Sequence, residues 1–229
     1  MFNVRRRFTS QGITWEQLAF QFLVVLLGVY LAVSFERKAE ERGRQGDAIE
    51  LLGHLLDELV LDEADFRVVA SAQAEIRVAL DSLGVLLAIG SDSNAPQIDS
   101  LLYGPLLSLV TAFPRRAAYS AMVSGGYLTA IPDQELTVKL ANLYEHSYPR
   151  LVHNGEYFDQ WGKEAFFVLG DYWDLEGRVF LRPGVNGTAP LRNAVRNFRD
   201  MGDFYALILG EAQVNLMALR EDVESYLGR

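Results

Sequence analysis

The chain has 229 residues, of which 50% are hydrophobic, and 30 Asp and Glu against 21 Lys and Arg give it a formal net charge of −9. This apolar content excludes a disordered chain. The absence of cysteine excludes a disulfide scaffold, cysteine-ligated zinc, iron–sulfur clusters and thiol catalysis. The acidic balance argues against nucleic acid as a partner, because a polyanion requires a basic surface.

An apolar segment near the N-terminus, residues 18–35, predicts a membrane-spanning helix, since only Gln21 and Ser34 within it are polar. At about 1.5 Å per residue, Trp15 to Phe35 spans roughly the 30 Å hydrocarbon core. A core helix of a soluble protein is the alternative, but charged residues bracket the segment closely. A cleaved signal peptide would have a shorter apolar run and a small-residue cleavage site, whereas this run continues into Glu36-Arg37-Lys38.

We expect a basic arm at 1–14, a membrane span at 15–36, a stalk at 37–50 and one helical-bundle domain at 51–229. Gly28 and Ala32, four residues apart, form a strip of small residues that suits helix packing in the bilayer. The side chains expected to mark the span are Leu18, Phe22, Leu26, Tyr30 and Phe35.

The charges flanking the span favour a cytoplasmic N-terminus. Basic residues are nearly equal in number on the two sides, but the C-terminal flank is neutralised by acids, and a long following domain translocates largely regardless of charge. We therefore expect the chain in the cytoplasmic membrane of a bacterium, with its C-terminal domain in the periplasm.

The remainder of the chain predicts an all-α bundle. A heptad of apolar residues begins at Leu52, and only Asp62 and Gln73 among its core positions are polar. The helix should end near Gly90, where a loop rich in serine and asparagine begins. The eleven core positions are Leu52, Leu55, Leu59, Asp62, Phe66, Val69, Gln73, Ile76, Leu80, Leu83 and Leu87.

Prolines and glycines divide the rest of the chain into further predicted helices. Residues 170–190, rich in glycine, aspartate and proline, predict a long loop with a short extended piece at Arg178–Leu181. The predicted helices are Ile98–Thr111 with a bend at Gly104-Pro105, Pro114–Ser124, one from Pro132 through Phe167 that Pro149 kinks or restarts, and Ala189–Tyr226.

The chain resembles a bacterial family of single-pass membrane proteins of unknown function. The resemblance rests on the apolar helix with its charged stalk and on the segments Phe113-Pro114-Arg115-Arg116-Ala117-Ala118-Tyr119, Gly126-Tyr127-Leu128 and Leu140-Ala141-Asn142-Leu143-Tyr144. It covers roughly residues 15–150 and implies a membrane-anchored helical module, without any catalytic residue.

Acidic residues and histidines offer two candidate metal sites. Carboxylates on neighbouring helices can bind a divalent cation, although a solvated helix face is the simpler interpretation. Asp62, at a core position, should pair with Arg115 or Arg116. His146 and His153 lie two helical turns apart and could ligate a metal or haem, or be ordinary polar residues. The acids are Glu50, Asp57, Glu58, Asp62, Glu63 and Asp65.

Arginines at a predicted helix start and a run of aromatic residues suggest a candidate partner interface. The start of the helix after Pro114 favours an anion from a partner or a lipid headgroup, with an internal salt bridge as the alternative. Core packing explains most aromatic residues between 144 and 173. A protein interface is the second option, because tryptophan and tyrosine are enriched at binding hot spots. Contact with a membrane surface is the third. The candidate interface comprises Arg115, Arg116, Tyr157, Trp161, Tyr172 and Trp173.

No catalytic or nucleotide-binding motif occurs in the sequence, so we expect a protein that is not an enzyme and needs no cofactor. The leading hypothesis is an accessory subunit of a larger membrane complex, of respiratory or photosynthetic type, with lipid and other integral membrane subunits as partners. An extracytoplasmic ligand-sensing domain is the alternative, disfavoured because the cytoplasmic part is too short for an output module. A membrane-tethered enzyme would need a cluster of titratable groups in a pocket.

Overall fold

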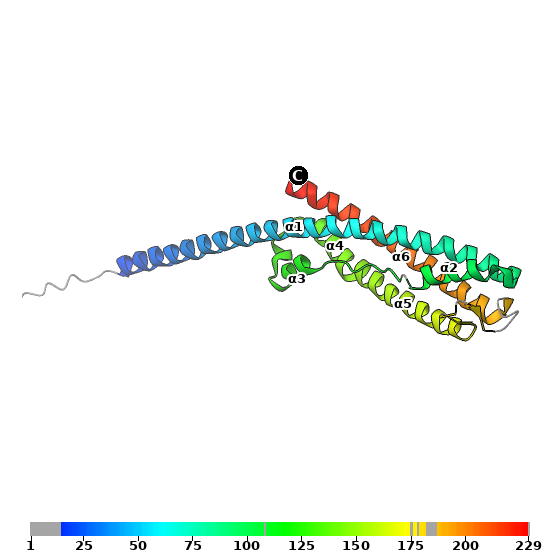
Figure 1. Ribbon diagram of the computed structural model, residues 1–229. Helices are drawn as coiled ribbons and strands as arrows, with labels where there is room; N and C mark the ends of the chain where they lie inside the picture. The colour runs from blue at the N-terminus through cyan, green and yellow to red at the C-terminus, as the bar shows by residue number, and fades with distance from the viewer. Residues whose placement is uncertain (1–14, 108, 175, 178, 182–186, 229) are drawn as a thin grey trace, which may run out of the picture. The chain divides into compact units, whose positions relative to one another are not determined.

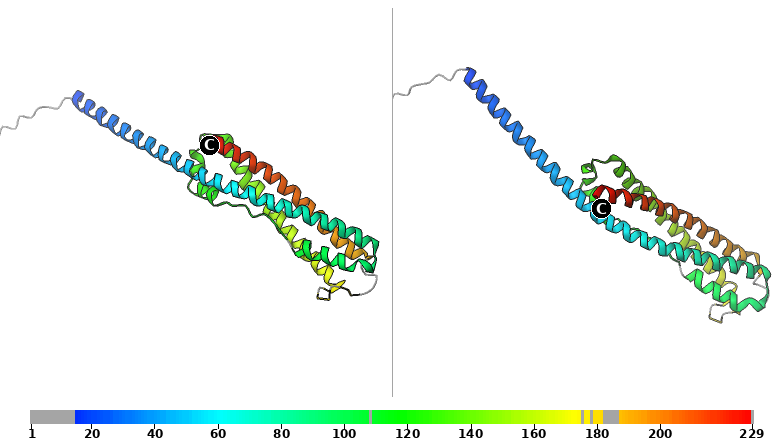
Figure 2. Two further views of the ribbon diagram at one scale, coloured as in Figure 1. Left: turned by 45° about the horizontal axis from the view of Figure 1, so that its top comes forward. Right: turned by 90° about the horizontal axis from the view of Figure 1, so that it is seen from above.

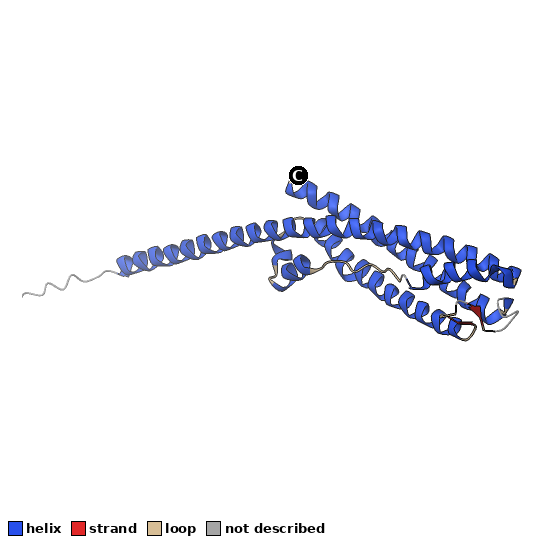
Figure 3. Cartoon of the chain, viewed as in Figure 1, coloured by secondary structure: helices blue, strands red, loops and turns tan. Residues whose placement is uncertain are grey.

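The computed structural model describes residues 15–107, 109–174, 176–177, 179–181 and 187–228 (Figure 1). The chain divides into two compact units, Met1–Asp47 and Ala48–Arg229. Helix α1, Trp15–Ile89, contributes to both units. The predicted all-α class is confirmed, because almost every described residue is helical and the strands are only two residues long (Figure 3).

The core-facing stripe of α1 in the second unit is the best-predicted feature. All eleven heptad positions from Leu52 to Leu87 are buried, including the polar residues Asp62 and Gln73. The helix ends at Ile89, followed by Gly90 in a left-handed conformation at φ 68° that favours glycine. The predicted end of this helix is therefore confirmed.

The second helix is displaced from its predicted position. After a short 3-10 turn, η1 (Asp92–Asn94), helix α2 covers Ala95–Leu107, so the prediction of Ile98–Thr111 is wrong at both ends. Pro105 lies in its last turn, where a missing N–H and a clash with the preceding turn disfavour continuation.

Residues 109–116 form a non-helical segment whose backbone bonds to side chains of the long helices. Gln73 donates its side-chain amide to the Val110 carbonyl at 2.7 Å. The backbone N–H of Ala112 donates to the Tyr205 hydroxyl at 2.8 Å. These bonds satisfy groups that a helix would otherwise pair, which explains why no helix forms there.

The next two helices begin later than predicted. Helix α3 is Ala117–Ser124 rather than Pro114–Ser124. The 3-10 turn η2, Tyr127–Ala130, follows, and then helix α4, Gln134–Ala141. Helix α4 starts after Pro132 because Asp133 caps it, accepting a bond from the backbone N–H of Leu136 at 3.0 Å.

A π-helical turn, η3 (Asn142–Ser147), joins α4 to helix α5, Tyr148–Gly170. The chain therefore passes Pro149 at the first turn of α5 without a break. The predicted loop beyond it contains a small antiparallel pair, β1 (Trp173–Asp174) with β2 (Val179–Phe180). The extended piece is confirmed at residues 179–180, whereas β1 was not predicted; Arg178 lies outside the described residues.

Helix α6, Ala189–Leu227, completes the second unit and matches its prediction to one residue. Figures 1 and 2 show α1, α2, α5 and α6 lying side by side along the bundle. Ion pairs link α6 to α1, Arg199 with Asp81 at 2.6 Å and Arg77 with Asp203 at 3.2 Å. The apolar faces of these helices make one core.

Candidate functional site

The apolar part of α1 is the first candidate site. It is the one helix of the described residues that is long and apolar enough to cross a membrane, and 0% of its apolar window is buried. The side chains of Phe22, Leu26, Tyr30 and Phe35 are all exposed. Burying them would release about 25 cal/mol for every Å² removed from water. The arm 1–14 and the side chain of Leu18 lie outside the described residues.

The strip of small residues on this segment is open. Gly28 and Ala32 are exposed, and a Cβ added at Gly28 would meet nothing within 4 Å. A second helix could therefore approach closely along this strip.

A buried polar cluster joins α1 to the segment before α3 and to α5. The Asp62 carboxylate is 1% exposed and accepts hydrogen bonds from the Arg115 guanidinium at 2.8 Å and the Tyr148 hydroxyl at 3.0 Å. It also accepts the backbone N–H of Arg115. The predicted pairing of Asp62 is thus confirmed for Arg115, although this arginine precedes the helix. Its backbone bond to Asp62 helps explain why α3 begins only at Ala117.

Burial raises the pKa of Asp62, and the bonds from Arg115 and Tyr148 oppose that rise. Burial also raises the pKa values of Tyr144 and Tyr148. The Tyr144 hydroxyl is buried without a hydrogen-bond partner among the described atoms, and its ring stacks on Tyr119 at 4.4 Å. The cluster thus combines a carboxylate paired with an arginine and tyrosine hydroxyls whose burial disfavours ionisation.

The second arginine also makes internal contacts. Arg116 donates to the Tyr144 carbonyl at 2.9 Å and lies 3.6 Å from the Glu145 carboxylate. The start of α3 is occupied as well, because the backbone N–H of Ala118 donates to the Glu58 carboxylate at 3.1 Å. An internal ion-pair network therefore accounts for both arginines, in place of an anion site.

The acidic stretch also faces arginines. Buried Glu63 pairs with Arg67 and with Arg220 of α6, and Asp65 pairs with Arg115 at 2.8 Å. Among the residues the structure describes, no group of three or more histidines or acids is arranged to hold a metal ion.

The two candidate histidines lie on different elements. His146 belongs to the π-helical turn, and His153 belongs to α5, where its ring packs edge-on against Tyr157 at 4.8 Å. The π-helical turn shifts the register between them, so the simple two-turn spacing predicted from the sequence does not apply.

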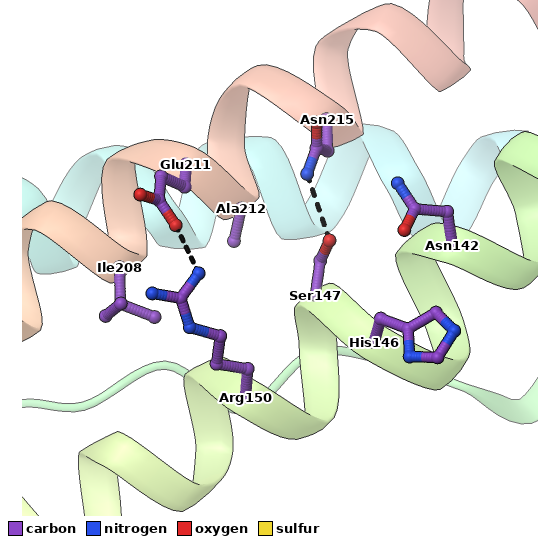
Figure 4. Close-up of a pocket in the computed structure, with 8 residues that line it drawn as sticks. All are labelled: Asn142, His146, Ser147, Arg150, Ile208, Glu211, Ala212 and Asn215. Carbon is purple, nitrogen blue, oxygen red and sulfur yellow. Dashed lines mark hydrogen bonds and ion pairs between the residues drawn. The ribbon is translucent and has the colours of Figure 1, made fainter.

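A polar pocket of about 240 Å³ lies between the π-helical turn and α6 (Figure 4). Two interactions cross it: Asn215 donates to the Ser147 hydroxyl at 3.0 Å, and Arg150 pairs with Glu211. Asn142 and His146 complete its polar lining, and Ile208 and Ala212 form its apolar floor. Sequence analysis missed this pocket, because no residue pattern indicates the π-helical turn that shapes it.

The aromatic candidates separate into core and surface residues. Trp173 is only 2% exposed, donates its indole N–H to Asp99 at 3.2 Å and packs edge-on against Phe180. It therefore belongs to the core rather than to a surface. Tyr157 is 47% exposed, whereas Trp161 and Tyr172 are half-buried. Of the four aromatic residues predicted for the interface, Tyr157, Trp161 and Tyr172 thus keep some exposed surface, although Trp161 and Tyr172 also pack against the core.

Comparison with known proteins identifies the family alone. The model of a family of unknown function, DUF6090, matches residues 21–176, and the chain belongs to this family. The match extends from the apolar part of α1 to β1 and so includes the Asp62 cluster and the π-helical turn. No curated protein and no solved structure matches the chain.

Proposed function

We propose that this DUF6090 protein is a non-enzymatic accessory subunit, anchored in the cytoplasmic membrane of a bacterium, that docks onto and stabilises a larger membrane protein complex. Its partners are lipid and the integral membrane subunits of that complex, which is of respiratory or photosynthetic type. The N-terminus lies in the cytoplasm and the helical bundle in the periplasm.

The observation that supports this proposal best is the exposed apolar segment of α1, residues 20–35. Phe22, Tyr30 and Phe35 are apolar and uncovered in the chain itself, so water is an unfavourable surrounding for them. A bilayer satisfies their side chains, and the helix satisfies its own backbone hydrogen bonds. The strip of Gly28 and Ala32 then provides a contact with a neighbouring membrane helix.

The aromatic surface of α5 supports a second contact outside the bilayer. Tyr157 and Trp161 lie one turn apart on α5, and Tyr172 follows its end. Amphipathic aromatic side chains of this kind anchor protein interfaces. Arg115 and Arg116, which the sequence also suggested for the interface, make internal contacts with Asp62, Asp65, Glu145 and the Tyr144 carbonyl instead.

Native pull-down on a C-terminal tag tests the proposal. The wild-type chain should retain large integral membrane proteins in constant ratio after gentle detergent extraction. Tyr157→Ala with Trp161→Ala should lose them, because the anchoring side chains are gone. Lys163→Ala, an exposed change on the same helix, is the matched control and should retain them. Equal retention by all three chains would contradict docking through α5.

A ligand-sensing role is the second candidate, favoured by the pocket beside Asn142 and Arg150. Its mixed lining of amides, imidazole and an ion pair suits a small polar molecule. The test is thermal unfolding of the full chain with amino acids and short organic acids. A rise in midpoint that Arg150→Ala removes would support sensing, and no rise with any of them would reject it.

A further inference from the structure

Helix α1 carries a second heptad stripe on its outer side. Positions spaced alternately by three and four residues, from 61 to 89, are all exposed. Six of them are apolar: Leu61, Ala64, Val68, Val78, Val85 and Ile89. A helix face that meets water normally carries charged residues, so apolar stripes on two sides of one helix indicate that both sides are covered.

The charges of this segment support the same conclusion. Between Val68 and Ile89 only Glu75, Arg77 and Asp81 are charged. Arg77 and Asp81 form ion pairs with α6. Glu75 is left as the single charge of this segment without an ion pair among the described residues.

The stripe borders a groove between α1 and α2. The groove, of about 330 Å³, lies between α1 and α2, and its lining includes the small residues Ala72, Ala79 and Gly104 beside the larger Glu75, Ile76 and Leu101. It continues past Val85 toward the end of α1. Small side chains let a neighbouring helix backbone approach closely, and the exposed valines then act as knobs.

We propose that the outer stripe of α1 is a dimer interface, on which a second copy of this chain packs its own α1 in parallel. A twofold axis along the helices places every stripe position against its own equivalent, and the alternating spacing is that of a coiled-coil seam. The parallel direction rests on the membrane anchoring proposed above, because two copies anchored in one membrane by the same end of the chain meet in parallel.

The size of the stripe indicates where the dimer forms. Residues 61–89 extend about 42 Å, and a contact strip about 10 Å wide gives roughly 400 Å² per copy. The total is slightly below the roughly 1,000 Å² of a stable soluble interface. Confinement in a membrane raises the effective concentration and compensates for the small area. Glu75, a polar residue at a seam position, weakens the pairing further.

Single-cysteine cross-linking of the full chain in its native membrane tests the dimer cleanly, because the sequence contains no cysteine. Val78→Cys and Val85→Cys, at seam positions, should each give a disulfide-linked band near twice the 25.7 kDa chain mass. Val214→Cys on α6 is the matched control, since Val214 is 67% exposed and Val78 is 66% exposed. It should stay monomeric.

A second variant distinguishes specific pairing through the outer stripe of α1 from random collision of two chains. Glu75→Leu in the Val78→Cys chain should increase the dimer band, because it removes the one charge from the seam. Equal bands for Val214→Cys and Val78→Cys, adducts of another mass, or no dimer from correctly folded Val78→Cys would each overturn the proposal. When Leu61→Cys and Ile89→Cys chains are produced together, a disulfide between the two, without any dimer from Val78→Cys, would overturn the parallel arrangement.

The dimer and the proposed docking role are tested independently. Pull-down of large membrane partners without a Val78→Cys dimer would reject only the dimer. A Val78→Cys dimer without such partners would reject only the docking role.

Discussion

The guanidinium of Arg115 lies 2.8 Å from the carboxylate of Asp62, a pair joined across 53 positions of sequence. Asp62 is at the core-facing stripe of α1, and Arg115 lies near the end of the non-helical segment that leads to α3. The contact therefore fixes that segment on α1 through a buried charge.

Removal of Arg115 should destabilise the protein strongly. Arg115→Met leaves the buried carboxylate of Asp62 without its cation, which should lower the free energy of unfolding by about 3 kcal/mol. Arg150→Met is the matched control, because Arg150 and Glu211 are both half-exposed and should contribute about 0–1 kcal/mol. Urea unfolding in detergent, followed by circular dichroism, measures both. An equal decrease in unfolding free energy for Arg115→Met and Arg150→Met would contradict a special contribution of the buried pair.

The decrease in the free energy of unfolding caused by Arg115→Met should depend on pH. Burial raises the pKa of Asp62 above its ordinary value of 3.8, and losing the Arg115 donors raises it further. A carboxyl with a raised pKa in the folded state favours folding while it is protonated, and this contribution is lost as pH rises through the folded pKa. The difference between wild type and variant should therefore be smallest below pH 3.8 and larger at neutral pH. Urea titrations at both ends of this range measure it, and a constant difference would contradict the assignment.

Trp173 should behave as a core residue. Trp173→Ala leaves a large cavity and an altered environment for Asp99, and should cost about 3–5 kcal/mol of unfolding free energy. Tyr157→Ala, at an exposed site, should cost far less and act on partner retention instead. Thermal and urea unfolding distinguish the two. A small effect of Trp173→Ala would place this residue on a surface.

Two glycines should respond to alanine in opposite directions. A Cβ at Gly162 of α5 would meet the Leu109 side chain at 2.6 Å, so Gly162→Ala should destabilise by about 1–3 kcal/mol despite the better helix propensity of alanine. A Cβ at Gly210 of α6 would meet nothing within 4 Å, and Gly210→Ala should stabilise by about 0.5–1 kcal/mol. The shift of the thermal unfolding midpoint shows whether each variant is stabilised or destabilised. Stabilisation by Gly162→Ala would contradict the close packing of α5 on the 109–116 segment.

The sequence predicted the parts of the fold that depend on regular spacing. The heptad of α1 and the extent of α6 follow from apolar periodicity, and the pairing of Asp62 follows from a polar residue at a core position. The start of α3 and the segment 109–116 depend on bonds from Asp62, Gln73 and Tyr205, which come from distant parts of the chain. Local sequence contains no trace of such bonds, nor of the π-helical turn that shapes the pocket. The core position of Trp173 likewise depends on Asp99 and Phe180, so composition alone suggested a surface.

Docking onto a larger membrane complex would determine the size of the particle in which the chain is found after native extraction. Membranes should be solubilised with a gentle detergent and separated by size, and the chain located by its C-terminal tag. The tagged chain should migrate with a set of large integral membrane proteins in fixed stoichiometry. Migration at the mass of one or two copies of the 25.7 kDa chain, with no other protein, would contradict it.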